Sequence, residues 1–315
     1  MAANPEKPAQ QEKSPLFSLS SNQNQLGLGL FGSSSFSSEK SLPPPPPCVE
    51  VLFSEGSSSV KYTLESVNFD GGFTLHKGRV STREVFALSN SDLVPGKYEG
   101  GLKLWEGSID LVKALHSEIQ GGLLCLSGKR VLELGCGHGL PGIFTCFKGA
   151  AAVHFQDFNA EVLRCLTIPN VNANFEKELG THKTEGDTQA KVRFFAGDWS
   201  EIHLLLPHVC DNDNEKAPDS RSEHDSGDGY DIILMAETIY SISSLQNLYE
   251  LIKKCLSRPH GVVYMAGKKH YFGVGGGTRH FLAVVEKDVD MAASLVAEVT
   301  DGSSNVREVW KLSFK

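Results

Sequence analysis

Hydrophobic positions between residues 130 and 266 fall into short apolar runs separated by longer segments with helical spacing. The short runs predict buried strands at 130–134, 153–156, 192–196, 232–236 and 262–266. Apolar residues three and four positions apart predict helices over 141–148, 160–175 and 245–256. This order indicates an α/β fold with a doubly wound, mostly parallel, Rossmann-like sheet, which the runs 281–285 and 306–312 would extend to seven strands.

Residues 48–97 have a different pattern, in which apolar and polar positions alternate over short stretches. Val49, Val51 and Phe53 alternate in this way, and a turn signal at 70–72 separates two further strand-like runs. This part predicts a small N-terminal β-rich extension of the main domain, which spans residues 98–315.

Two segments are too polar to pack. Residues 1–47 are rich in Ser, Gln, Asn and Gly and end in a proline run, and residues 207–229 are dominated by charged and turn-forming side chains. Neither buries enough apolar surface to offset the entropy of ordering, so we expect a disordered tail and a disordered surface insertion. The tail lacks the apolar segment of a secretory signal and the arginines of an organelle transit peptide, so the expected location is the cytoplasm and nucleus.

The composition argues against several classes of function. The 315 residues carry a formal net charge of −8, which argues against direct sequence-specific nucleic-acid binding through a basic surface. The seven cysteines form no Cys-x-x-Cys pair, so neither a zinc site nor a disulfide framework is indicated. No window approaches the roughly 18–20 apolar residues of a membrane span. We expect a metal-free monomer without membrane contact.

The strongest chemical signal is the run Glu-Leu-Gly-Cys-Gly-His-Gly-Leu-Pro-Gly from Glu133 to Gly142. It ends a predicted strand and opens a predicted helix, so its small residues let the backbone approach a ligand near unpaired N–H groups. Gly137, Gly139 and Gly142 also satisfy the dinucleotide fingerprint Gly-x-Gly-x-x-Gly. Taken alone, the run therefore fits more than one ligand.

Acidic residues near this turn narrow the choice. Glu133 at the strand end would repel a pyrophosphate but would suit an ammonium or sulfonium group, which favours S-adenosylmethionine. The turn also begins at Gly135, ahead of the fingerprint. Asp157 ends the second strand, where a carboxylate can accept the ribose hydroxyls of either ligand.

Further candidates follow the third and fourth strands. Asp198 and Trp199 combine a carboxylate with an aromatic plane, which suits adenine, although Asp198 could instead be a helix N-cap. Glu237 and Tyr240 follow the fourth strand, at the edge where the active sites of such sheets lie. Tyr240 could instead be a half-buried tyrosine that packs at the edge of the site without a role in binding or catalysis.

The order of these motifs resembles that of class I, seven-strand methyltransferases that use S-adenosylmethionine. Two stretches are more specific, namely Asp-Leu-Val-Pro-Gly-Lys-Tyr-Glu-Gly-Gly-Leu-Lys-Leu-Trp-Glu at 92–106 and Gly-Lys-Lys-His-Tyr-Phe-Gly-Val-Gly-Gly-Gly at 267–277. They resemble the protein-histidine N-methyltransferase family, and the resemblance covers about residues 48–290. It implies methylation of a histidine ring nitrogen in a large-subunit ribosomal protein (ribosomal protein three of the large subunit), as the free protein or an assembly intermediate.

Carried over position by position, the resemblance implies cofactor contacts from Trp105, Glu106, Gly107, Gly135, Gln156, Asp157, Phe158, Gly197, Asp198 and Trp199. Glu133 and Gly137 in the turn and Ala236 at the end of the fourth strand complete the predicted cofactor site. Related lysine-directed enzymes place Asp-x-x-Tyr after that strand. Here Glu237 replaces the Asp, as in the histidine-directed branch.

Glu237 and Tyr240 are the predicted catalytic residues. A lysine substrate must lose a proton, at a cost of roughly 4.6 kcal/mol at neutral pH, whereas an imidazole is already mostly neutral. A histidine-directed site therefore needs a group that fixes the tautomer by accepting the other ring N–H. Glu237 or a backbone carbonyl could accept it, and Tyr240 could orient the ring.

Alternative interpretations stay open at this point. A lysine-directed methyltransferase of the neighbouring branch and a non-catalytic ribosome-assembly factor with the same fold are the alternatives to a histidine-directed enzyme. Cys136 is interpreted as packing rather than as a nucleophile, and His270 and His280 lack a third metal ligand nearby. The stretch 273–279 lacks the ending of a P-loop and is interpreted as a loop at the pocket mouth, a candidate substrate clamp.

Overall fold

The computed structural model of the chain describes residues 44–57, 59–89, 92–179, 190–208, 229–300, 302 and 305–315, all within the unit Leu42–Lys315. The predicted tail, apart from residues 44–47, and the predicted insertion, apart from residues 207, 208 and 229, lie outside these ranges. None of the helices within them combines the length and the apolar character needed to cross a membrane.

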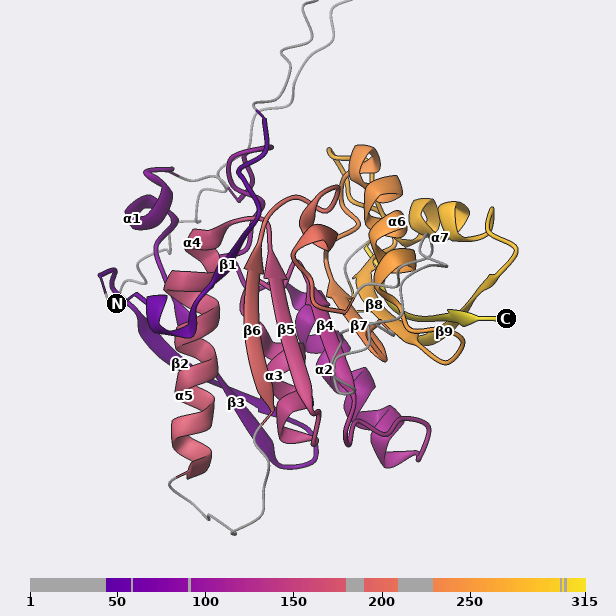
Figure 1. Cartoon of the computed structure of the whole chain (residues 1–315), viewed down its shortest axis with the longest axis horizontal. Helices are drawn as coiled ribbons and strands as arrows, with labels where there is room; N and C mark the ends of the chain where they lie inside the picture. The colour runs from indigo at the N-terminus through magenta and orange to yellow at the C-terminus, as the bar shows by residue number, and fades with distance from the viewer. Residues whose placement is uncertain are drawn as a thin grey trace, which may run out of the picture. The chain divides into compact units, whose positions relative to one another are not determined.

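A central sheet organises the described chain, with the strand order β1-β6-β5-β4-β7-β8-β10-β9 (Figure 1). Strands β4 to β8 run parallel to one another, whereas β10 is antiparallel to β8 and β9, and β1 is antiparallel to β6. The winding reverses at β4, with β5 and β6 on one side and β7 and β8 on the other. The strand bounds are β1 (Val49–Val51), β4 (Arg130–Leu134), β5 (Ala152–Asp157), β6 (Lys191–Ala196), β7 (Ile232–Ala236), β8 (Val262–Lys268), β9 (Met291–Val299) and β10 (Arg307–Phe314).

Helices cover both faces of this sheet. Successive residues of a strand point to opposite sides, so strands that are apolar throughout need a layer of helices on each side. Val131 packs in one apolar cluster with residues of α2 (Glu106–Gln120), α3 (Leu140–Phe147) and α5 (Ile168–Leu179). Its neighbour Leu132 packs in a second cluster with α6 (Leu245–Cys255) and α7 (Thr278–Val285). Shorter helical elements are η1 (Phe53–Glu55), α1 (Thr82–Phe86), α4 (Ala160–Val162), the π-helical turn η2 (Leu163–Thr167), η3 (Ile202–Leu204) and η4 (Ile242–Ser244).

The predicted α/β fold is confirmed, and six of the seven expected strands are present in a sheet that β1 and β9 extend to eight strands. The five predicted apolar runs are β4 to β8, and the run 306–312 is β10. The predicted strand at 281–285 is wrong, because these residues end helix α7, where Phe281, Leu282 and Val285 are buried with helical spacing. A five-residue apolar run does not distinguish a strand from a buried helix turn. Helix α2 and strand β9 were not predicted.

The N-terminal extension has two separate parts in the structure. Strand β1 joins the edge of the central sheet, whereas β2 (Thr63–Phe69) and β3 (Phe73–Arg79) form a hairpin with its turn at 70–72, as the sequence predicts. The buried Asn170 of α5 joins this hairpin to the main domain. Its side-chain oxygen accepts hydrogen bonds from the Gly78 N–H and the Tyr62 hydroxyl, and its amide donates to the carbonyl of His138 in the Gly-rich turn.

We expect Asn170→Ala to lower the free energy of unfolding by about 3 kcal/mol, because it leaves the Gly78 N–H and the His138 carbonyl unpaired in the interior. Urea unfolding measures the change. Asn68→Ala, on the exposed face of the hairpin, is the control and should change stability by less than about 0.5 kcal/mol. Equal effects of the two substitutions would contradict the joining role of Asn170.

Candidate cofactor and substrate site

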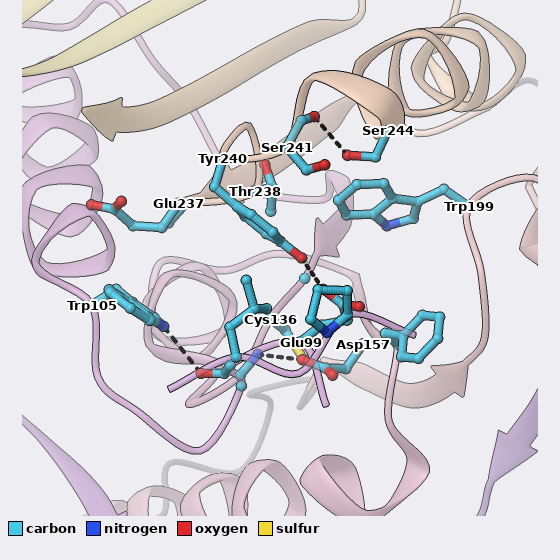
Figure 2. Close-up of a pocket in the computed structure, with 18 of the residues that line it drawn as sticks. Glu99, Trp105, Cys136, Asp157, Trp199, Glu237, Thr238, Tyr240, Ser241 and Ser244 are labelled. Carbon is cyan, nitrogen blue, oxygen red and sulfur yellow. Dashed lines mark hydrogen bonds between the residues drawn. The ribbon is translucent and has the colours of Figure 1, made fainter. Parts of the chain in front are cut away.

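A cavity of about 560 Å³ lies at the carboxyl ends of β4 to β7, where the winding reverses (Figure 2). Its size is that of a typical small-molecule pocket. Eleven of the predicted site residues line it: Trp105, Gly135, Gly137, Asp157, Phe158, Gly197, Asp198, Trp199, Ala236, Glu237 and Tyr240. The other four predicted residues, Glu106, Gly107, Glu133 and Gln156, do not belong to its wall.

The Gly-rich turn after β4 follows a path that side chains would obstruct. Gly135 and Gly137 have φ values of 60° and 48°, in the left-handed region that favours glycine. A Cβ atom on Gly137 would also lie 2.9 Å from the carbonyl oxygen of Gly101. The turn therefore brings bare backbone to the cavity wall, where a ligand can approach it closely.

Asp157 at the end of β5 is buried in the wall of the cavity. Its two carboxylate oxygens accept hydrogen bonds from the N–H groups of Gly137 (3.0 Å) and Asn159 (3.0 Å). Burial raises the pKa of this carboxyl from 3.8 to about 6. Because a carboxylate can accept about four hydrogen bonds, Asp157 retains capacity for ligand hydroxyls.

Gln156 lies behind the cavity wall and joins the ends of three strands. Its side-chain oxygen accepts hydrogen bonds from the Gly135 N–H (3.3 Å) and from the indole N–H of Trp199 (3.0 Å), and its amide donates to the carbonyl of Gly197 (2.9 Å). Gln156 therefore orients the Trp199 ring, which faces Trp105 across the cavity in Figure 2.

Asp198 lies in a tight turn at the wall next to Trp199. One of its oxygens accepts hydrogen bonds from both the N–H and the hydroxyl of Ser200. The N-cap of the following helical turn η3 is Glu201, so Asp198 does not occupy the N-cap position that was its alternative interpretation.

Glu133 is buried beneath the turn and points into the start of α3. Its Oε2 accepts a hydrogen bond from the Gly142 N–H (2.8 Å), and burial raises its pKa from 4.5 to about 8. Gly142 is the third glycine of the dinucleotide fingerprint. The Gly142 N–H at the start of the helix is therefore already bound to Glu133 and cannot bind a pyrophosphate.

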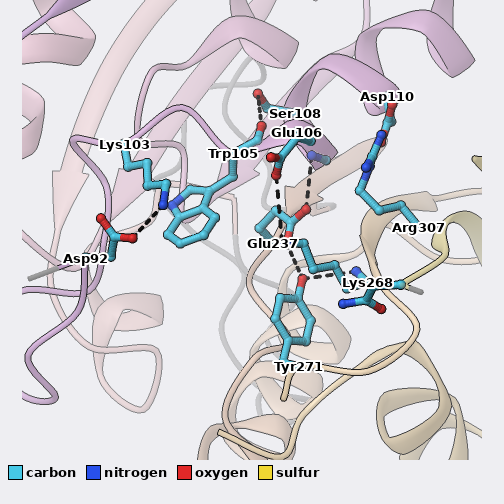
Figure 3. A network of polar contacts seen from close by, with 12 residues as sticks. Asp92, Lys103, Trp105, Glu106, Ser108, Asp110, Glu237, Lys268, Tyr271 and Arg307 are labelled. Atoms are coloured by element: carbon cyan, nitrogen blue, oxygen red, sulfur yellow. Dashed lines mark hydrogen bonds and ion pairs between the residues drawn. The ribbon is translucent and has the colours of Figure 1, made fainter. Parts of the chain in front are cut away.

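Glu237 directs its carboxyl group away from the Tyr240 hydroxyl (Figure 2) and toward α2 (Figure 3). It has a φ of 58°, which is rare for a residue with a long side chain. One carboxylate oxygen accepts the Gly107 N–H (3.0 Å), and the other accepts the Tyr271 hydroxyl. Burial raises the pKa of Glu237 above its usual range. Glu106, next to Gly107, is exposed and lies 3.8 Å from the Lys268 ammonium group.

Tyr240 faces the cavity and donates its hydroxyl hydrogen bond to Glu99, which sequence reasoning missed. The other carboxylate oxygen of Glu99 accepts the Gly96 N–H (2.7 Å). Burial raises the pKa of Tyr240 far above its usual range. Glu99 lies inside the stretch 92–106 that carries the family resemblance, but no spacing rule connects it to Tyr240, 141 positions later.

Two further features of the wall bear on the ligand. Thr238 lines the cavity, and its buried hydroxyl has no hydrogen-bond partner among the described residues. Of the described residues that line the cavity, Lys103 is the sole lysine or arginine, and its ammonium group pairs with Asp92 (2.5 Å). The carboxylates of the wall are Glu99, Asp157, Asp198 and Glu237.

Together these residues fit S-adenosylmethionine better than a dinucleotide. An acidic wall favours a cationic ligand and disfavours phosphates. Asp157 can accept ribose hydroxyls, and the indole of Trp199 beside Asp198 offers adenine an aromatic face and an acceptor. No group of three His, Cys, Asp or Glu side chains is gathered for a metal ion anywhere in the described ranges.

The pKa of Glu133 gives a testable dependence of stability on pH. A carboxyl group whose pKa is raised from 4.5 to about 8 by folding contributes fully below pH 4.5, and this contribution is lost as the pH rises toward 8. Glu133→Gln keeps an acceptor for the Gly142 N–H but cannot ionise. Between pH 5 and 8 its stability should therefore fall less steeply than that of the wild type, by up to about 1.4 kcal/mol per pH unit.

Urea unfolding at several pH values between 5 and 8 measures this difference. The control is Glu250→Gln, an exposed position on α6. A slope of the Glu133→Gln variant equal to that of the wild type would show that Glu133 is ionised throughout this range.

Comparison with known proteins places the chain in a family. No protein-family model matches it. The histidine protein methyltransferase 1 homologue of Dictyostelium discoideum is 40% identical over 228 residues, which cover 72% of this chain and 62% of the relative. The homologue of Bos taurus is 37% identical over 242 residues, which cover 73% and 58%. The chain thus spans about three fifths of the length of these relatives.

Histidine protein methyltransferase 1 of Schizosaccharomyces pombe is 33% identical over 242 residues, which cover 71% of this chain and 68% of the relative. Among solved structures, magnesium protoporphyrin IX methyltransferase of Synechocystis aligns with a TM-score of 0.42 at 12% identity, covering 65% of this chain and 79% of that chain. On the extent and identity of the sequence matches, the chain belongs to the histidine protein methyltransferase 1 family.

Proposed function

We propose that this protein transfers a methyl group from S-adenosylmethionine to a ring nitrogen of a histidine in a protein substrate. The family to which the chain belongs supports the reaction and the class of substrate. The observation that carries the proposal is the acidic cavity, which four residues with carboxylate side chains line together with one paired lysine. For the substrate we propose a large-subunit ribosomal protein, as the sequence resemblance implies.

The residues that would hold the cofactor are those that line the cavity after β4, β5 and β6. Asp157 would accept the ribose hydroxyls, Asp198 and Trp199 would bind adenine, and the turn at Gly135 would contact the methionine part. When bound, S-adenosylmethionine supplies a methyl group on a positively charged sulfur. The carboxylates of the wall favour the binding of such a charge.

Glu99 and Tyr240 are the groups that can position the imidazole. A neutral imidazole has one ring N–H and one lone pair, so an acceptor for the N–H turns the lone pair toward the methyl group. As the nitrogen bonds to carbon, positive charge develops on the ring, and a nearby carboxylate stabilises it. Glu99 and Glu237 each already accept two hydrogen bonds, but Glu99 is partly exposed at the cavity, whereas Glu237 is 7% exposed and directs its carboxyl group toward α2. We therefore assign this role to Glu99.

The two alternative functions have less support. A lysine-directed enzyme would need to deprotonate its substrate, and the relatives that match more than half of this chain bear the name of histidine-directed enzymes. A non-catalytic assembly factor would have no need for a ligand-sized cavity at which the Gly-rich turn, Asp157 and Trp199 meet.

The proposed reaction is tested by incubating the protein with a large-subunit ribosomal protein fraction and methyl-labelled S-adenosylmethionine, followed by mass spectrometry with mapping of the modified site. We expect a label on one histidine. A label on lysine would move the protein to the neighbouring branch. Cofactor binding without any label would favour the assembly role, and the absence of both would refute the enzymatic proposal.

The role of Glu99 is tested by Glu99→Gln, which keeps the shape of the side chain and removes its charge. We expect the kcat for histidine methylation to fall by about 10²-fold or more, because the charge that develops on the ring loses its carboxylate. The dissociation constant of S-adenosylhomocysteine, measured by calorimetry, should change by less than about threefold. A parallel loss of cofactor affinity would make Glu99 a cofactor residue instead.

Glu237→Gln is the comparison for this experiment. Its carboxyl group supports α2 and Tyr271 rather than facing the cavity centre, so the substitution should lower the melting temperature together with cofactor affinity. If Glu237→Gln lost turnover while stability and cofactor affinity were retained, the imidazole acceptor would be Glu237 and not Glu99.

A further inference from the structure

Three large apolar side chains are exposed beside the cavity, one at the start of η4 and two on the 271–277 loop. Phe272 is 76% exposed, Ile242 55% and Val274 45%, and Val274 also lines the cavity. Ser241 and Gly275 form a β-bridge that joins the two segments, and a Cβ on Gly275 would lie 3.2 Å from the side chain of Ile242. We call Ile242, Phe272 and Val274 the apolar lip.

The loop that carries Phe272 and Val274 is hydrogen-bonded to the segment that carries Tyr240. The N–H groups of Gly276 and Gly277 donate to the carbonyls of Tyr240 (2.9 Å) and Ile239 (2.9 Å). A Cβ on Gly276 would lie 2.2 Å from the Ile239 carbonyl oxygen, so the close contact requires glycine. The lip therefore has a defined position relative to the cavity.

Both ends of the loop are also fixed by side chains. At its start, the Tyr271 hydroxyl donates to Glu237 and accepts the Lys268 N–H (3.2 Å), as Figure 3 shows for the Tyr271–Glu237 contact. At its end, the buried Glu308 accepts a hydrogen bond from the hydroxyl of Thr278. Because the loop is held in this way, it presents Phe272 to solvent on a supported backbone.

Charged groups near the lip are already paired within the protein. The ammonium group of Lys268 lies 3.8 Å from Glu106, and that of Lys269 lies 3.2 Å from Glu308. Arg279 likewise lies 3.7 Å from Glu308. This surface therefore offers a partner apolar contact rather than an unpaired positive charge, which argues against an acidic or RNA partner at this place.

We propose that the apolar lip docks the polypeptide substrate beside its target histidine, through an apolar side chain near that histidine in the substrate sequence. The inference rests on the proposed function. A histidine that enters the cavity remains part of a chain, so the neighbouring residues must cross the rim, where Val274 continues the cavity wall outward. A small-molecule substrate enclosed in the cavity would leave the 76% exposed Phe272 uncovered, whereas a polypeptide can cover it.

The test compares the double substitution Phe272→Ser and Val274→Ser with Leu123→Ser. Leu123 is 68% exposed and follows the end of α2 opposite to the cavity, so it controls for the loss of an exposed apolar side chain. Methylation of the large-subunit ribosomal protein fraction gives KM and kcat, and calorimetry gives the affinity for S-adenosylhomocysteine. We expect KM to rise about tenfold or more in the double variant, with kcat and cofactor affinity within about twofold of wild type.

Three outcomes would overturn the inference and one would overturn the function beneath it. An unchanged KM in the double variant would refute docking at the lip. A fall in kcat alone would show that the loop takes part in the chemical step. An equal rise in KM for Leu123→Ser would show that the effect is not specific to the lip. A wild type that methylates no histidine refutes the proposed function itself. Ile242→Ser, which leaves the 271–277 loop intact, should raise KM in the same direction if the double variant fails to fold.

Discussion

The reversal of winding at β4 is the constraint on which the rest of the structure depends. With β5 and β6 on one side and β7 and β8 on the other, the chains leaving β4 and β7 diverge, and a cavity opens between them. The chain leaves each of these two strands through a residue with a left-handed backbone conformation, Gly135 after β4 and Glu237 after β7. The polar groups that follow these turns therefore reach one space, although they are far apart in the sequence.

Buried acidic groups lie in the wall of this space and directly beneath it. Glu133, Asp157 and Glu237 are all buried, and desolvation raises the pKa of each. The fold offsets this cost with backbone N–H donors from Gly142, Gly137 and Gly107, in each case at a loop or at the start of a helix. The one lysine of the described wall is paired with Asp92, so it does not neutralise the carboxylates of the cavity. A cationic ligand would supply this positive charge.

The sequence predicted the parts of this arrangement that depend on local pattern. The parallel strands follow from short apolar runs, and the Gly-rich turn and Asp157 follow from their place at strand ends. The pairing of Glu99 with Tyr240 could not be predicted, because it depends on how a loop before α2 folds over the sheet. Neither could the direction of Glu133 and Glu237, since a position at a strand end does not determine which side chain faces the cavity and which supports the backbone.

Glu237 shows how a residue expected to act on the substrate can act on the shape of the site instead. Its carboxyl group spans from the end of β7 to the start of α2 and to Tyr271, which holds the loop of the apolar lip. An aspartate is one methylene shorter and would not reach both partners from the same backbone position. The presence of Glu here is therefore explained by this span. Because one carboxylate supports both the wall beside Trp105 and the rim beside Val274, a change at this position would move the cofactor side and the substrate side of the cavity together.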